Sequence, residues 1–238
     1  MSKEPDARFV AYLDMLGIAN LTLHRPEMAW AALSKLATER ARVRGYKILD
    51  KATGEDMSER LYDFTFSDTI VIMTRGDEEH DLSAIVTTSL ELFIASLAAS
   101  IPIRGAIAHG RFLFNLDYSL FSGPPLVRSY RLAEEAQWLG VVLEPDIAQG
   151  TRQIPLVCGG VPVALEWDVP LKGGTTEKRH VLDWPCTHRP NWKVEPPISV
   201  EAFYGAFEPL FGPLDTLTRD ARGKYENTTS FVNERLAT

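Results

Sequence analysis

The stretch FVAYLDMLGI, residues 9–18, decides the fold, because it is a nearly continuous apolar run with one carboxylate, Asp14, just before a Met-Leu-Gly turn. Short apolar runs that end at a glycine are typical of buried strands, so residues 8–14 are predicted to form one. An ionised aspartate taken out of water needs hydrogen bonds, an opposite charge or a metal ion. Asp14 therefore marks either a functional site or a helix or turn cap, a role in which Asp is favoured.

A predicted hairpin supplies the partner for Asp14. Residues 60–66 and 69–74 are rich in β-branched and aromatic residues and are separated only by Ser67 and Asp68, which indicates a tight turn. If the hairpin lies beside the first strand, the two carboxylates come close together, since neighbouring strands are about 4.8 Å apart. Such charges repel by roughly 4 kcal/mol at about 4 Å and an effective dielectric constant of about 20, and a divalent cation removes the repulsion. The alternative is that Asp68 is an ordinary hairpin residue.

The remaining pattern predicts alternating helices and strands. Apolar residues at three-to-four spacing, bounded by proline or glycine, predict helices at residues 26–45, 81–99 and 127–139. Apolar runs predict a strand pair at 103–114, kinked at Gly110, and a hairpin of strands 161–167 and 178–184. The order βαββαββα favours an α+β domain over residues 1–184. A Pro-rich linker, 185–198, and a helical extension, 199–238, follow, with helices near 199–210 and 214–236.

Composition narrows the class of protein. The chain has 238 residues, of which 45% are apolar and 24% charged, and its net charge is −7. These values are typical of a globular domain and disfavour general nucleic-acid binding, which depends on neutralising phosphates. No signal peptide and no membrane span is recognised, so a cytoplasmic location is expected. Cys158 and Cys186 lack zinc-site spacing and are expected to be reduced thiols.

Five stretches occur in the order of the motifs of class III nucleotide cyclases. YLDMLGI resembles the family's F-D-I-x-G-F signature, FTFSDTIVI its T-I-G-D metal hairpin, and IRGAIAHGRFL its R-x-G-I-x-x-G strand. GPPLVRSYRLAEEA resembles the G-x-x-V-N-x-A-x-R helix, and VPLKGGTTEKRHVLDW the V-K-G-x-G hairpin. The set covers about residues 8–184. The resemblance implies a ferredoxin-like α+β catalytic domain that works as a head-to-tail homodimer, with active sites between the subunits.

By this resemblance, Asp14 and Asp68 hold two divalent metal ions, Mn²⁺ or Mg²⁺, and the Met15 backbone carbonyl helps at one of them. Oxygen-only ligation suits these ions. Backbone amides of the following turn would bind the triphosphate, as turns that lead into helices bind anions; they belong to Leu16, Gly17 and Ile18.

Two cations complete the implied site. Arg131 matches the family arginine that stabilises charge in the transition state, and Lys172 matches the lysine that grips the terminal phosphates. Taken alone, Arg131 is equally a surface helix residue and Lys172 a turn residue. Arg104 and Arg128 are further basic candidates, for which solvent exposure is expected.

The sequence departs from the adenylate and guanylate cyclase patterns where the base is read. The two polar base-reading positions are occupied by Phe64 and Leu120, and the family asparagine before the arginine aligns with Val127. Apolar side chains cannot read a purine edge. Phe64, with Tyr62 or Phe66 nearby, would narrow the base pocket so that a pyrimidine fits better than a purine.

The chain most resembles the standalone pyrimidine cyclases of bacterial antiphage signalling, the Pycsar systems. That resemblance implies synthesis of cyclic UMP from UTP, and a separate effector protein that the product activates. Cytidylate cyclase activity is the nearest alternative. Two others are a nucleotide-binding regulatory module without turnover and a diguanylate cyclase-like enzyme, although the GGDEF-type hairpin of the latter is absent.

Overall fold

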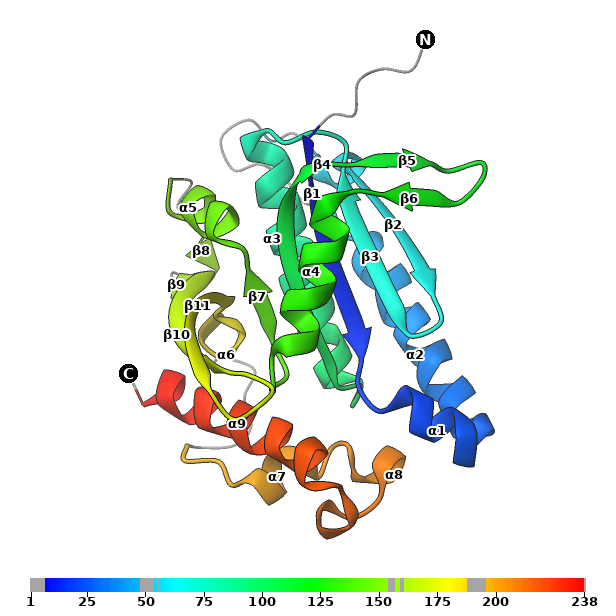
Figure 1. Ribbon diagram of the computed structural model, residues 1–238, viewed down its shortest axis with the longest axis vertical. Helices are drawn as coiled ribbons and strands as arrows, with labels where there is room; N and C mark the ends of the chain where they lie inside the picture. The colour runs from blue at the N-terminus through cyan, green and yellow to red at the C-terminus, as the bar shows by residue number, and fades with distance from the viewer. Residues whose placement is uncertain are drawn as a thin grey trace.

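A seven-stranded sheet lies at the centre of the molecule, in the order β10-β11-β7-β4-β1-β3-β2 (Figure 1). The computed structural model describes residues 7–47, 54, 56–153, 157–158, 161–187 and 196–237. The strands of this sheet are β1 (Ala7–Met15), β2 (Leu61–Phe66), β3 (Thr69–Thr74), β4 (Ile103–Arg111), β7 (Val141–Leu143), β10 (Ala164–Pro170) and β11 (Thr176–Leu182).

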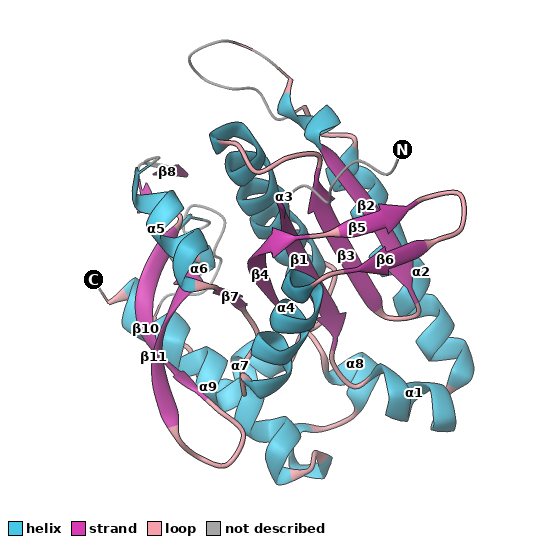
Figure 2. Ribbon diagram, turned by 45° about the horizontal axis from the view of Figure 1, so that its top comes forward, coloured by secondary structure: helices cyan, strands magenta, loops and turns pink. Residues whose placement is uncertain are grey.

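Helices cover the two faces of the sheet unequally. The long helices α2 (Pro26–Arg44) and α3 (Glu79–Ala98) lie on one face, and α4 (Pro124–Glu135) lies alone against β1 and β4 on the other. A short hairpin on the α4 face, β5 (Leu113–Asn115) and β6 (Leu120–Ser122), extends across β2 and β3 (Figure 2). We call this hairpin the arm.

The shorter elements connect these layers. They are α1 (Ile18–His24), η1 (Met57–Arg60), α5 (Pro145–Gln153), β8 (Val157–Cys158), β9 (Val161–Pro162), α6 (Trp184–Thr187), α7 (Val200–Tyr204), α8 (Glu208–Phe211), η3 (Leu214–Thr216) and α9 (Arg219–Leu236).

The first half of the chain has the ferredoxin-like arrangement that the sequence predicts. The elements follow the order β1, α2, β2, β3, α3, β4, and the strands lie in the order β4-β1-β3-β2 with antiparallel pairing throughout. β1 lies inside the sheet and packs against α3 on one face and α4 on the other, which explains its nearly continuous apolar sequence. Pro26 occupies the first turn of α2, and Gly45 follows its last residue, as predicted.

α3 is long and apolar enough to cross a membrane by length and composition, which differs from the expectation that the chain holds no such run. Of its most apolar 18 residues, 72% are buried inside the protein. Burial in the core accounts for this composition, since α3 packs against both the sheet and α2.

Three predicted elements have different bounds in the structure. The helix predicted at 127–139 begins earlier and ends at Glu135, because prolines follow Gly123 at its start and Ala136 is extended. The strands of the second hairpin are Ala164–Pro170 and Thr176–Leu182, so each lies nearer the turn than predicted. The turn is shorter because Gly173 and Gly174, which both have positive φ, form it. The strand pair predicted at 103–114 is wrong, because β4 continues through Gly110 to Arg111 and β5 pairs with β6 instead. The strand β7 and the helices α1, α5 and α6 were not predicted.

The C-terminal helices are shorter than predicted. Gly205 separates α7 from α8, and Gly212, with φ 84°, and Pro213 end α8, so that α9 starts only at Arg219. Residues 188–195 of the predicted linker, and the side chain of Cys158, lie outside the described residues. The Cys186 thiol donates a hydrogen bond to the Arg235 carbonyl (3.2 Å).

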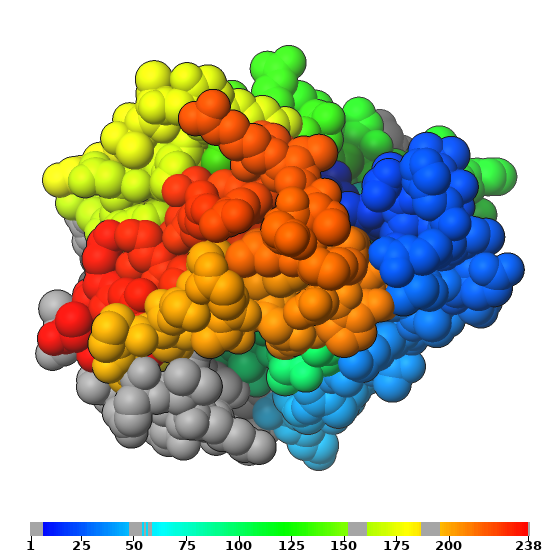
Figure 3. All heavy atoms as spheres, turned by 90° about the horizontal axis from the view of Figure 1, so that it is seen from below, coloured from blue at the N-terminus to red at the C-terminus, as the bar shows by residue number. Residues whose placement is uncertain are grey.

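α9 packs into the same hydrophobic core as the sheet. Phe231 is completely buried against the rings of Trp138, Trp167 and Trp184. Seen from below, the C-terminal segment in orange and red lies across this end of the molecule and meets the blue N-terminal residues (Figure 3). This segment therefore lies at the end of the sheet where β1 ends and where Asp14 lies.

Candidate active site

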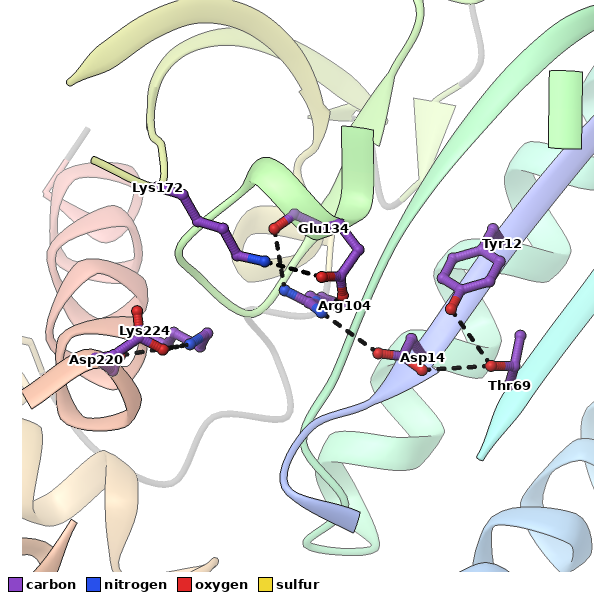
Figure 4. Close-up of polar contacts among 8 residues, drawn as sticks. All are labelled: Tyr12, Asp14, Thr69, Arg104, Glu134, Lys172, Asp220 and Lys224. Carbon is purple, nitrogen blue, oxygen red and sulfur yellow. Dashed lines mark hydrogen bonds and ion pairs between the residues drawn. The ribbon is translucent and has the colours of Figure 1, made fainter. Parts of the chain in front are cut away.

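Asp14 lies near the end of β1, between β3 and β4. Its Cα partners are Thr69 on β3 and Arg104 on β4. The Thr69 hydroxyl donates to Asp14 Oδ1 (3.3 Å), and Arg104 Nη2 lies 3.5 Å from Asp14 Oδ2 (Figure 4). The capping alternative is wrong for Asp14, because the residue that precedes α1 is Gly17 and α1 has no side-chain cap.

Asp68 lies in the β2–β3 turn, beside the end of β1. Ser67, the other turn residue, has φ 54°, and the Met15 amide donates to the Asp68 carbonyl (3.2 Å). Burial raises the pKa of Asp14, and the negative charge of Asp68 raises it further. The charge of Asp68 therefore acts on Asp14, as expected if the two acidic residues lie near each other.

The pKa of Asp14 has a consequence for stability. Arg104 and Thr69 lower this pKa but do not cancel the effects of burial and of Asp68. The folded chain thus holds the Asp14 proton more tightly than the unfolded chain, so this group favours folding at acid pH and loses that contribution as the pH rises through the folded-state pKa.

We expect Asp14→Asn to raise the melting temperature of the metal-free protein at pH 7.5, because the substitution removes a buried charge next to Asp68. The rise should be about 2–4 °C, which corresponds to about 1 kcal/mol in a chain of this size. Thermal unfolding in EDTA measures it. At pH 4 the difference between the variant and wild type should shrink, and a gap that widened there would contradict this account of Asp14.

The donors at this site fit a divalent metal ion. Two carboxylates and a strand-end carbonyl, that of Met15, supply only oxygen, which Mg²⁺ and Mn²⁺ prefer. A cation would also relieve the repulsion that raises the pKa of Asp14. The described residues contain no group of three or more His, Cys, Asp or Glu side chains placed to bind a metal, so a site here depends on two carboxylates and backbone oxygen.

Arg104 links Asp14 to α4 and to the second hairpin. The expectation that Arg104 is exposed is wrong: it is 6% exposed, its guanidinium pairs with Glu134, and burial lowers its pKa although Asp14 opposes this. Glu134 Oε2 in turn accepts from Lys172 Nζ at 2.8 Å. Arg128, about half exposed, pairs with Glu144.

Lys172 therefore lies at the far end of a chain of charges that begins at Asp14. It follows Leu171 in the β10–β11 turn, and its side chain is 51% exposed. Its amide donates to the Glu135 carbonyl (2.8 Å), which holds the turn against the end of α4. In this chain Lys172 is neutralised by Glu134, and a phosphate contact would have to replace that pair.

The turn after β1 has only part of the backbone geometry that is needed to bind a triphosphate through three amides. Gly17 has φ 81°, a conformation that favours glycine. The Leu16 amide is already used, since it donates to the Pro102 carbonyl (2.9 Å). Neither the Gly17 amide nor the Ile18 amide donates a hydrogen bond to another described residue.

Arg131 lies on the exposed face of α4. It has no hydrogen bond or ion pair within the described part of the chain. The preceding residue, Tyr130, points toward the sheet and meets Tyr12 edge to face, with ring centroids 5.4 Å apart. Arg131 is thus outside the Asp14 cluster of its own chain.

The predicted base-pocket residues lie on the α4 face of the sheet and on the arm. Phe64 pairs with Val71, which pairs with Tyr12, so Phe64 shares a face with Asp14. Its ring stacks on Phe121 of the arm at 3.7 Å, and Tyr62 packs on Phe114 of the arm at 5.3 Å.

Leu120, the next predicted pocket residue, is 62% exposed on the arm. It precedes Phe121 on β6, so the two side chains point to opposite faces of the arm. Within one chain, Leu120 is therefore not joined with the two strand residues in a pocket.

Sequence reasoning missed the residues that surround the carboxylates: Tyr12, Thr69 and Glu134. Tyr12 and Thr69 hydroxyls lie 3.4 Å apart, and burial raises the pKa of Tyr12 to about 12, so that its hydroxyl keeps its proton. Tyr12 and Asp14 are two positions apart in one strand, and this spacing was the available signal that they share a face.

Comparisons with known proteins bear on the fold. No family model and no curated protein matches the chain. Among solved structures, the chain resembles the catalytic core of a rhodopsin-guanylyl cyclase with converted specificity in complex with ATPαS, with TM-score 0.53 and 16% identity over 76% of this chain and 96% of that one.

Two weaker likenesses are to similar proteins. A bacterial light-regulated adenylyl cyclase gives TM-score 0.46 and 10% identity over 75% of this chain and 91% of that one. A class III adenylyl cyclase-like ATP-binding protein from Pseudomonas aeruginosa gives 0.43 and 12% over 97% and 42%. On the first likeness and its own topology, the chain has the α+β fold of a class III nucleotide cyclase catalytic domain.

Proposed function

We propose that the protein is a pyrimidine nucleotide cyclase that converts UTP to 3′,5′-cyclic UMP and pyrophosphate. The ribose 3′ hydroxyl attacks the α-phosphorus, and pyrophosphate leaves with the P–O bond electrons. By its resemblance to the Pycsar cyclases, the product would serve as a second messenger of antiphage defence and act on a separate effector protein.

One observation carries the proposal: two acidic residues distant in sequence, Asp14 and Asp68, lie at one end of the sheet, where burial and the charge of Asp68 raise the pKa of Asp14. A structural pair would be expected to gain from its contacts. Here burial and like charge both oppose ionisation, which is typical of functional carboxylates.

The residues of the chain divide the work as follows. Asp14, Asp68 and the Met15 carbonyl would hold two divalent ions, Mn²⁺ or Mg²⁺, while the turn at Gly17 and Ile18 would bind the triphosphate through its amides. When bound, such ions lower the pKa of the attacking hydroxyl and offset phosphoryl charge. Arg131 would stabilise the charge that develops in the transition state.

A head-to-tail homodimer fits the position of Arg131. Large apolar side chains are exposed on the α4 face: Leu113, Tyr118 and Leu120 on the arm, Val127 and Tyr130 on α4, and Phe66 at the β2–β3 turn, with exposures from 46% to 81%. Such patches mark interaction surfaces. A second copy on this face would bury them and bring its Arg131 toward the metal site of the first.

The preference for a pyrimidine depends on Phe64. Its ring is fixed by stacking on Phe121, so the wall it would form cannot move aside easily for a larger base. Polar groups near the site are few, since Phe64, Leu120 and Val127 occupy the positions where purine cyclases carry polar residues. A smaller base would leave fewer of its own polar groups unpaired.

We expect UTP to be cyclised at least about tenfold faster than ATP or GTP, in kcat/KM, because a narrow pocket rejects the larger base. Purified protein is incubated with each of the four nucleoside triphosphates and Mn²⁺, and products are identified by mass spectrometry. Comparable turnover of all four would contradict the narrow pocket. A preference for CTP would make it a cytidylate cyclase, and return of every triphosphate unchanged would make it a binding module.

A further inference from the structure

A cavity of about 360 Å³ lies between the turn after β1 and the C-terminal segment. One wall is formed by Leu16, Gly17 and Arg25, and the other by Phe211 and Lys224. The Phe211 ring lies so close to Gly17 that a Cβ there would be 2.8 Å from Cε1. The C-terminal segment is thus packed directly against the turn proposed to bind the triphosphate.

The C-terminal segment is fastened at this position by polar contacts as well. Arg25, which ends α1, donates from Nη2 to the Leu210 carbonyl at 2.5 Å. Tyr204 donates from its hydroxyl to the Gly212 carbonyl (2.6 Å), which fixes the bend before α9. The cavity is therefore a built feature of the fold and requires no movement to form.

Lys224 on α9 is a positively charged residue that lines this cavity. Its side chain is 11% exposed, whereas that of Lys172 is 51% exposed. Its ammonium group pairs with Asp220 one turn earlier on α9, and Asp220 itself is 68% exposed (Figure 4). The one ion-pair partner of Lys224 among the described residues is this solvated carboxylate, so a second anion in the cavity would find a cation with little competition.

The cavity is close to the metal site. Asp220 is one of the charged groups that raise the pKa of Arg104, the residue that pairs with Asp14. The cavity begins at Leu16, two residues after Asp14. With Arg25 and Lys224 against Asp220, its charged walls are net positive in a chain of net charge −7.

We infer that Lys224 binds the terminal phosphates of the nucleotide, so that the C-terminal segment is part of the active site of its own chain. This inference rests on the proposed function and adds to it a phosphate-binding residue that lies outside the cyclase-like motifs. On binding, Lys224 exchanges its contact with Asp220 for the β- or γ-phosphate. Asp220 competes with the substrate for the same ammonium group.

The opposite charges of the pair give a test in two directions. Inorganic tripolyphosphate with Mn²⁺ is titrated calorimetrically into the full-length protein and its variants. Lys224→Met should weaken binding about tenfold or more, since a hydrogen bond to a charged group is lost. Asp220→Asn should strengthen binding, and Lys224→Arg should retain most of it. Arg222→Met, on the same helix and paired only with Glu226 among the described residues, is the matched control and should bind as wild type.

Turnover supplies a second readout. Lys224→Met should raise the KM for UTP with little change in kcat, because the residue holds phosphates that are bound in both ground and transition states. Wild-type affinity in Lys224→Met would overturn the inference. Weaker binding in Asp220→Asn would also overturn it, because a pair that served only the structure would be disrupted by replacing either residue. Absence of cyclic product would instead count against the proposed function, since tripolyphosphate binding is measured without turnover.

Discussion

Asp14→Asn and Asp68→Asn are each expected to lower kcat about a thousandfold or more, because each removes an anionic ligand of the proposed metal site. Bound metal ions supply several kcal/mol of transition-state stabilisation, and about 1.4 kcal/mol corresponds to a factor of ten. The rate of cyclic UMP formation, followed by chromatography with saturating UTP and Mn²⁺, measures the effect.

The matched control for these variants is Asp168→Asn. Asp168 is an exposed carboxylate on β10, remote in sequence from the turn after β1, and its replacement should leave kcat unchanged. The inactive variants should remain folded, and Asp14→Asn should be more stable than wild type at neutral pH. Near wild-type turnover in either metal-site variant would contradict the assignment of Asp14 and Asp68.

Arg131→Ala is expected to lower kcat about 10²–10³-fold, with the KM for UTP little changed. An arginine that meets charge developing in the transition state contributes on this scale, and it does so without tightening the ground state. Arg42→Ala is the control, since Arg42 lies on α2, on the other side of the sheet, and its side chain is 48% exposed. An equal loss in both variants would show a general effect of charge.

Mixing the two kinds of inactive variant tests whether Arg131 acts across subunits. Asp14→Asn and Arg131→Ala proteins, mixed in equal amounts and allowed to exchange, should recover about a quarter of wild-type activity, because half of random dimers are mixed and each keeps one intact site. If both residues served the same chain, no mixture could regain activity.

The ferredoxin-like half of the fold could be predicted because its signals are local. Pro26 and Gly45 bound α2, and the two-residue turn at Ser67 and Asp68 fixes the register of β2 on β3. Elements too short to show a period, such as the three-residue β7, were missed, although β7 joins the two parts of the sheet.

The pair of carboxylates was predictable, but the surroundings were not. Asp14 and Asp68 could be expected to meet because each ends or joins a recognisable strand. Arg104 was expected in solvent, since its burial depends on its place opposite Asp14 in the β1–β4 register and on Glu134 from α4. Those contacts join segments far apart in the chain, and no local pattern encodes them.

The C-terminal segment shows the same limit. Two helices were expected in it, near 199–210 and 214–236, but Gly205, Gly212 and Pro213 divide it into shorter elements. Its position against Gly17 follows from the packing of Phe211 and Phe231. Lys224 therefore has no sequence signal that would connect it with the turn after β1.

The most direct test of the central claim is anomalous diffraction at the manganese edge from crystals grown with Mn²⁺ and 3′-deoxy-UTP, which lacks the attacking hydroxyl. We predict two manganese peaks about 3.5–4 Å apart, both bound by Asp14 and Asp68 and one also by the Met15 carbonyl. Nucleotide bound with no manganese between these carboxylates, and Asp14 still held by Thr69 and Arg104, would contradict the account.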